Sequence, residues 1–131
     1  LLEDVGVPIP KLGDLVEGIA EIAERNGVRI PVMAHAGDGN THPLVVFDPT
    51  VEGEEERANK AYGEVMSLAI NLGGTITGEH GVGKLKQPWL KSYLGEDVYE
   101  LNERIKEALD PQGILNPGTM VVVGPHAKPN A

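Results

Sequence analysis

VRIPVMAHAGDGNTHPLVVF, residues 28–47, sets two apolar runs on either side of a glycine-rich turn. Residues 28–36 and 43–47 are rich in apolar and β-branched side chains, which predicts one strand for each run. Asp38-Gly39 is among the strongest signals for a two-residue hairpin turn, because both central positions of that turn require positive φ angles. The stretch therefore predicts an antiparallel β-hairpin.

The predicted turn brings two histidines together. With Asp38 and Gly39 as the turn residues, His35 pairs directly with His42, and both side chains lie on one face of the hairpin. Cβ atoms so placed are about 4.5–5.5 Å apart, which lets two imidazoles bind one metal ion. A turn one residue later would set His35 opposite Leu44 and weaken this case. A polar contact between the histidines, without a metal, is the other interpretation.

The remaining segments complete an α+β pattern. We expect a mostly antiparallel sheet with helices packed on one face, because strands and helices alternate irregularly along the chain. Apolar residues at helical spacing predict three helices, over residues 12–25, from about residue 54 to Gly73, and over about 96–109. Two short strands are also predicted, an edge strand ending at Pro8 and one over residues 75–77. Residues 121–131 are expected to form a loosely ordered tail.

Composition excludes several classes of function. The 131 residues are enough for one ordinary domain, and 40% hydrophobic content suits a globular protein with a core. A net charge of −9, with one Phe, one Trp and three Tyr, argues against nucleic acid as a partner. The chain has no cysteine, which excludes disulfides and thiolate metal sites. No apolar run is long enough to span a bilayer.

A second glycine-rich stretch, GEHGVGK at residues 78–84, resembles a phosphate-binding loop but departs from it. The Walker A pattern needs Ser or Thr after its lysine, and Leu85 stands there. Glu79 would set a carboxylate against phosphate oxygens. The first stretch fails similarly, because His42 occupies the third glycine position of the dinucleotide fingerprint. Neither stretch is therefore expected to bind nucleotide phosphates.

Glu79 is instead the best candidate for a third metal ligand. It lies in a glycine-flanked loop, where the backbone can approach other groups closely. Two histidines and one carboxylate leave positions open on a metal for water or substrate. His80 is expected to enter the same space as a general base, because imidazole exchanges protons near neutral pH. Lys84 and Lys86 are expected to be solvated.

Three motifs in this order, AHAGDGNTHP, GGTITGEHGVG and DPQGILNPG, resemble the C-terminal part of the FAD-linked oxidases of the vanillyl-alcohol-oxidase superfamily. Within these, the chain is most similar to the glycolate oxidase flavoprotein subunit and to the D-lactate and D-2-hydroxyglutarate dehydrogenases. The resemblance implies that residues 1–120 are a fragment of the larger substrate or cap domain with a C-terminal segment. It places most FAD contacts in an N-terminal FAD-binding domain of the same protein.

The resemblance also implies roles for individual residues. It assigns His35, His42 and Glu79 to a divalent metal ion, with Zn²⁺ as the expected metal. It makes His80 the catalytic base, and it places Asn116 of the NPG segment near the flavin.

The implied activity is oxidation of a small 2-hydroxy acid, of the glycolate or D-lactate type, with metal assistance and hydride transfer to FAD. The isolated fragment is expected to be inactive. A non-catalytic metal-binding or interaction module of the same fold is the alternative, and a metallohydrolase is a third interpretation. The family implies a cytoplasmic protein, and it allows a homodimer and membrane association through partner subunits.

Overall fold

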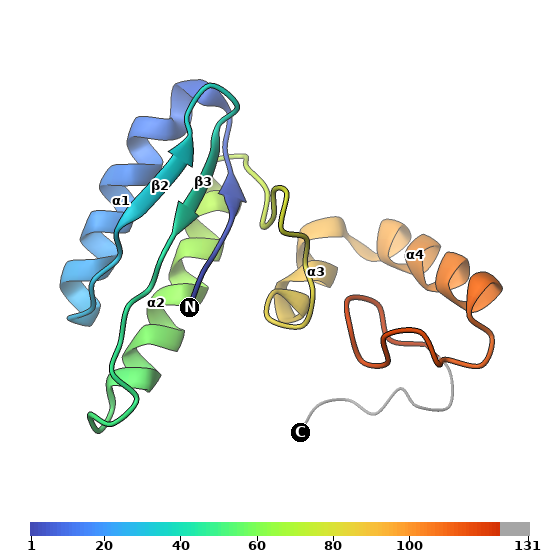
Figure 1. The fold of residues 1–131 in the computed structure, drawn as a ribbon. Helices are drawn as coiled ribbons and strands as arrows, with labels where there is room; N and C mark the ends of the chain where they lie inside the picture. Colours follow the sequence, from blue (N-terminus) through green and yellow to red (C-terminus); the bar gives the residue numbers. More distant parts are fainter. Residues whose placement is uncertain (124–131) are drawn as a thin grey trace. The chain divides into compact units, whose positions relative to one another are not determined.

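The computed structural model describes residues 1–123 and divides the chain into two compact units, Leu1–Gly81 and a second that starts at Val82. The first unit contains a three-stranded antiparallel sheet of β1 (Val5–Gly6), β2 (Val32–His35) and β3 (Asn40–Pro43). β3 is the central strand. Helices α1 and α2 lie side by side along one face of this sheet (Figure 1). The predicted α+β fold with an antiparallel sheet is therefore confirmed.

Helix α1, Leu12–Asn26, confirms the helix predicted over residues 12–25. A short 3-10 turn, Ile9–Lys11, leads into it. The helix turns its apolar face inward and buries Leu15, Ile19 and Ile22. It ends at Gly27, whose φ of 63° is the left-handed conformation that favours glycine at a helix C-terminus.

Helix α2, Glu54–Asn71, confirms the second predicted helix. Acidic residues occupy its first turn, where they interact favourably with the positive end of the helix dipole. Its buried face is rich in alanine, which allows close packing against α1. The closeness is measurable at Gly18 of α1, where a Cβ atom would lie 2.6 Å from Cδ2 of Leu68. These two helices and the sheet form the core that carries the site.

The hairpin of β2 and β3 forms as predicted, but in a different register. His35 lies opposite Asn40, and His42 lies opposite Met33, so the direct pairing of the two histidines was wrong. The loop contains four residues, 36–39, instead of two, and the amide of Asp38 donates to the carbonyl of His35 across 2.9 Å. Gly39 is the only residue of this loop with a positive φ, whereas the predicted turn needs a positive φ at both Asp38 and Gly39.

Two predicted strands are also shorter or shifted. The strand predicted over residues 43–47 begins earlier, at Asn40, and continues past Pro43 only as isolated bridges. The strand predicted over residues 75–77 is reduced to one bridge between Thr75 and Gly6. β1 lies at the edge of the sheet, as predicted for the first strand.

The second unit contains two helices, α3 (Gln87–Leu94) and α4 (Glu96–Leu109), which pack against each other. α4 confirms the third predicted helix, whereas no helix was predicted for α3. Lys86 at the start of α3 is only 4% exposed, so the prediction that it is solvated was wrong.

Beyond α4 the chain continues in turns to residue 123, and Val121 there is buried. The predicted tail covers residues 121–131, of which residues 124–131 lie outside the described part. Among residues 1–123, none of the helices combines the length and the apolar character required to cross a membrane.

Candidate metal centre

His35 and His42 lie on the same face of the sheet, on neighbouring strands and diagonally across the ladder. His35 is the last residue of β2, and its side chain is 56% exposed. His42 lies in the central strand, where flanking strands leave its side chain only 11% exposed. Their ring centroids are 5.2 Å apart in an edge-to-face arrangement. The expected meeting of the two imidazoles therefore occurs, despite the shifted register.

Glu79 reaches both histidines from a loop that follows α2. Its Oε1 atom is 3.5 Å from Nε2 of His35 and 3.6 Å from Nε2 of His42. The potential ligand atoms of these three residues all lie within 4.8 Å of one another. Ligands at the vertices of a tetrahedral zinc site, each about 2.0–2.1 Å from the ion, are about 3.3–3.5 Å apart. The donor set fits a single divalent ion, with two nitrogens and one oxygen.

Asn40 controls the other side of the Glu79 carboxylate. Its Nδ2 atom donates to Oε2 of Glu79 across 3.4 Å, so Oε1 is the oxygen that faces the imidazoles. The Asn40 amide also lies close against Gly78, where a Cβ atom would be 2.5 Å from its Oδ1 atom. Glycine at position 78 is what lets the Asn40 side chain reach the glutamate. Sequence reasoning missed this contact.

His80 adjoins the three donors but is not one of them. Its ring stacks on that of His42 with centroids 4.8 Å apart and an interplanar angle of 19°. Its Nε2 atom is 4.0 Å from Oε1 of Glu79, and the residue is exposed. The structure thus brings together all four residues that the sequence predicted for this region.

The hydrogen bonding of the second ring nitrogen of His42, Nδ1, differs from that in most metal sites. A metal-binding histidine generally donates its remaining ring N–H to an acceptor, which fixes the ring orientation. Nδ1 of His42 is buried and has no hydrogen-bond partner among the described residues. On its other side the ring has its Nε2 atom 3.6 Å from Oε1 of Glu79, and it packs against the rings of His35 and His80.

The loop that carries Glu79 is bound to the start of the chain. Thr75 and Gly6 exchange two backbone hydrogen bonds, of 2.8 and 3.3 Å, at the beginning of this loop. Farther along, the amides of Gly78 and His80 both donate to Oδ2 of Asp4, across 2.8 and 2.7 Å. Asp4 is fully buried. Sequence reasoning did not identify this carboxylate, because its partners lie more than 70 residues away along the chain.

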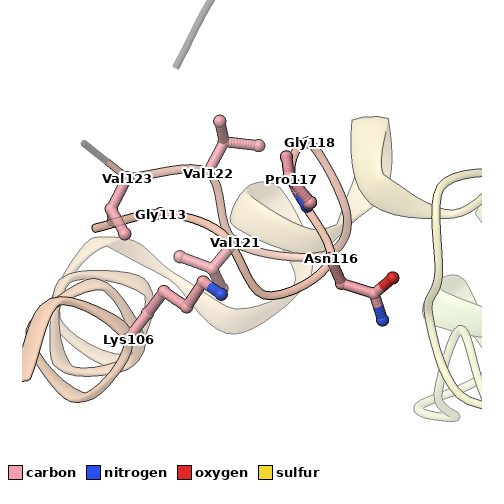
Figure 2. Close-up of a pocket in the computed structure, with 8 residues that line it drawn as sticks. All are labelled: Lys106, Gly113, Asn116, Pro117, Gly118, Val121, Val122 and Val123. Carbon is pink, nitrogen blue, oxygen red and sulfur yellow. The ribbon is translucent and has the colours of Figure 1, made fainter. Parts of the chain in front are cut away.

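Asn116, which the family resemblance places near the flavin, lies in the second unit. It begins a turn in which the amide of Thr119 donates to its carbonyl oxygen across 3.2 Å. Its φ of 48° is in the left-handed region, which asparagine tolerates better than most residues. Figure 2 shows its amide extending away from Lys106 and Val123, which line the other side of a small hollow. The flavin contact of Asn116 remains a prediction.

An ion pair between Lys106 and the buried Asp110 holds the segment that precedes Asn116. Nζ of Lys106 donates to Oδ2 of Asp110 and to the carbonyl oxygen of Leu115, each across 2.6 Å. The Asp110 carboxylate also accepts the amides of Ile114 and Leu115, each across 3.0 Å. The hydrogen bond from Lys106, with those two amides, holds the pKa of Asp110 below its usual value against the opposing effect of burial.

Comparison with known proteins identifies relatives over almost the whole chain. The family of FAD linked oxidases, C-terminal domain, matches residues 1–120. The chain is 43% identical over 120 residues to the glycolate oxidase subunit GlcD of Bacillus subtilis, which covers 92% of this chain and 26% of that protein. It is 38% identical over 115 residues to the subunit of the same name in Escherichia coli K12, covering 88% of this chain and 23% of that protein.

A mitochondrial D-lactate dehydrogenase [cytochrome] of Arabidopsis thaliana is 36% identical over 121 residues, covering 92% of this chain and 21% of that protein. The chain thus spans about a quarter of the length of these relatives.

Proposed function

Since this chain belongs to the family of C-terminal domains of FAD-linked oxidases, we propose that it provides the metal-binding and proton-accepting part of a flavin-dependent 2-hydroxy-acid dehydrogenase. The substrate is a small 2-hydroxy acid of the glycolate or D-lactate type, as the names of its relatives suggest. The observation that carries the proposal is the convergence of His35, His42 and Glu79 within 4.8 Å.

The three donors are suited to hold one Zn²⁺ or a similar divalent ion. Two neutral imidazoles and one carboxylate provide a ligand set with positions left open for a substrate. When bound, the ion would supply a Lewis acid that lowers the pKa of the substrate hydroxyl. Asn40 keeps Oε1 of Glu79 turned toward the histidines, so the donors are already oriented before an ion enters.

His80 is the residue that accepts the proton from the substrate hydroxyl, at its Nε2 atom. It is exposed and stacks on His42, which places its ring beside the metal ligands. Because it is outside the ligand set, its nitrogen is left available for proton transfer. Most FAD contacts are made by an N-terminal FAD-binding domain, for which the remaining three quarters of the relatives' length leaves room. Asn116 contributes a contact to the flavin.

The first experiment tests the metal by titration of Zn²⁺ into the purified chain. Glu79→Gln replaces an anionic ligand with a neutral amide, and we expect it to weaken Zn²⁺ binding by more than the roughly 10–100-fold usual for residues that only orient metal ligands. A His35→Ala, His42→Ala double variant should abolish binding. Glu17→Gln is the matched control, because Glu17 is exposed on α1 and the change is chemically identical. Equal Zn²⁺ affinity in wild type and Glu79→Gln would show that these residues are not a metal site.

The second experiment tests the reaction in the full-length protein, by following the flavin absorbance after mixing with D-lactate or glycolate. His80→Ala should slow flavin reduction by about 10²–10⁴-fold, the usual contribution of a general base. It should leave the Zn²⁺ affinity close to that of wild type, because His80 is not a ligand. An unchanged reduction rate in His80→Ala would contradict the role of this base.

A further inference from the structure

The metal donors come from two separate parts of the first unit. His35 and His42 belong to the β2–β3 hairpin, whereas Glu79 belongs to the loop that follows α2. A metal site needs these parts held in a fixed relation, because ligand atoms displaced by even about 0.5 Å lose the productive geometry. Some contact must therefore fix the Glu79 loop to the strands that carry the histidines.

Asp4 makes that contact. Its Oδ2 atom accepts hydrogen bonds from the amides of Gly78 and His80, the two residues that flank Glu79, at 2.8 and 2.7 Å. Its Oδ1 atom accepts from the hydroxyl of Thr77 at 3.3 Å. One carboxylate thus receives three hydrogen bonds from one short stretch of the loop. The backbone on both sides of Glu79 is held at one point.

Asp4 is itself held by the strand that carries His42. The amide of Glu3 donates to the carbonyl of Pro43 across 3.0 Å, and Val5 pairs with Thr41 in the sheet. These two pairings flank Asp4 and place it beside His42. Asp4 is fully buried, so its hydrogen bonds are shielded from competing water.

We infer that Asp4 is a positioning residue that fixes Glu79 in register with His35 and His42. The inference rests on the proposed metal site. Asp4 orients the ligand Glu79 through the backbone of its loop and does not itself contact the ion. What Asp4 contributes is a correctly placed acceptor oxygen, and its negative charge is not required. Both backbone amides end on the same oxygen, so an asparagine at position 4 retains the acceptor they need.

Three variants separate geometry from charge and from general stability. Asp4→Asn keeps an acceptor oxygen but removes the charge, whereas Asp4→Leu keeps a similar shape and removes every acceptor. Thr41→Val is the matched control: it removes one buried side-chain hydrogen bond from the same sheet, from Oγ1 of Thr41 to the carbonyl of Val5 at 3.0 Å. It keeps the backbone pairing of Val5 with Thr41 and changes none of the hydrogen bonds between Asp4 and the Glu79 loop.

The measurement is the dissociation constant for Zn²⁺, determined by titration of each variant of the chain. We expect Asp4→Leu to weaken binding by about 10–100-fold, as is usual for residues that orient metal ligands. Asp4→Asn should remain within about threefold of wild type, and so should Thr41→Val. Wild-type affinity in folded Asp4→Leu would overturn the inference while leaving the metal site intact. An equal loss in Asp4→Asn and Asp4→Leu would also overturn it, since charge would then be the cause.

A second measurement needs neither a metal nor a variant. Amides in hydrogen bonds to a buried carboxylate exchange their hydrogens slowly. In the wild-type chain we expect slow exchange at Gly78 and His80. Fast exchange at both amides would overturn the inference even if Asp4→Leu failed to fold. Failure of the wild-type chain to bind Zn²⁺ would instead overturn the proposed function, so the two failures are distinguishable.

Discussion

Gly39→Ala is expected to damage the hairpin that carries the two histidines. Gly39 has a φ of 74°, in the left-handed region that alanine adopts only with strain. A Cβ atom at this position would lie 2.1 Å from the carbonyl oxygen of Val7, well inside any allowed contact. The amide of Val7 also donates to the carbonyl of Gly39 across 3.0 Å. The loop must therefore move away from Val7 and break this hydrogen bond.

The strained φ and the overlap with Val7 together set the expected fall in the free energy of unfolding. A left-handed φ costs alanine about 1–2 kcal/mol. Relief of the overlap by a backbone shift costs about a further 1–3 kcal/mol, as for other overpacked sites. The free energy of unfolding should therefore fall by about 2–5 kcal/mol, a large part of the roughly 5–15 kcal/mol typical of a whole domain.

Urea denaturation, followed by circular dichroism, measures this loss as a lower midpoint at constant m-value. Gly37→Ala is the matched control in the same loop, because Gly37 has no positive φ and a methyl group there would meet nothing within 4 Å beyond its chain neighbours. We expect Gly37→Ala to change the free energy of unfolding by less than about 0.5 kcal/mol. Equal midpoints for Gly37→Ala and Gly39→Ala would refute the assignment of strain to Gly39.

Three further changes test the core, the ion pair and the Asn116 turn. Met66→Ala opens a cavity in the core and should lower the free energy of unfolding by about 2–5 kcal/mol in urea, whereas Val51→Ala, at a residue 49% exposed, should be nearly neutral. Lys106 lowers the pKa of Asp110 in the folded state, so the ionised carboxylate stabilises the folded chain. This stabilisation is fully present above about pH 4, the pKa of an unfolded aspartate, and is lost as the pH falls through the lower pKa of the folded state. Asp110→Asn should therefore be less sensitive than wild type to acid in that range, measured by urea midpoints against pH. Asn116→Gly should be at least as stable as wild type, and Asn116→Ala less stable by about 1 kcal/mol, because φ is 48° there.

Three of the helices could be predicted because their stability depends on local pattern. α1, α2 and α4 each exceed three turns, long enough for helical spacing of apolar residues to be recognised. α3 has only eight residues, a proline in its first turn, and one buried residue, Leu90. A stretch so short and so little buried has no periodicity to detect. Its helix was missed for that reason.

Asp4 could not be found from the sequence for a different reason. Its partners, Gly78 and His80, are 74 and 76 residues away. They bind Asp4 through backbone amides, which every non-proline residue has. No residue type marks the donor end of such a hydrogen bond. Glu79 was found because it lies in a glycine-flanked loop whose backbone can approach other groups closely, whereas the residue that fixes its backbone has no local pattern.

The histidine pair was predicted correctly from an incorrect register, and the parity of the spacing explains why. His35 and His42 are seven positions apart. Side chains alternate between faces along each strand, so a loop with an even number of residues places both on the same face. The predicted loop of two and the observed loop of four satisfy this condition equally. An odd loop without a bulge would have set the imidazoles on opposite faces, out of reach of one carboxylate. The shared face was therefore the stronger part of the prediction. Glu79 then joins the two histidines, because its Oε1 atom lies within 3.6 Å of Nε2 in both rings. This arrangement does not require His35 to pair directly with His42.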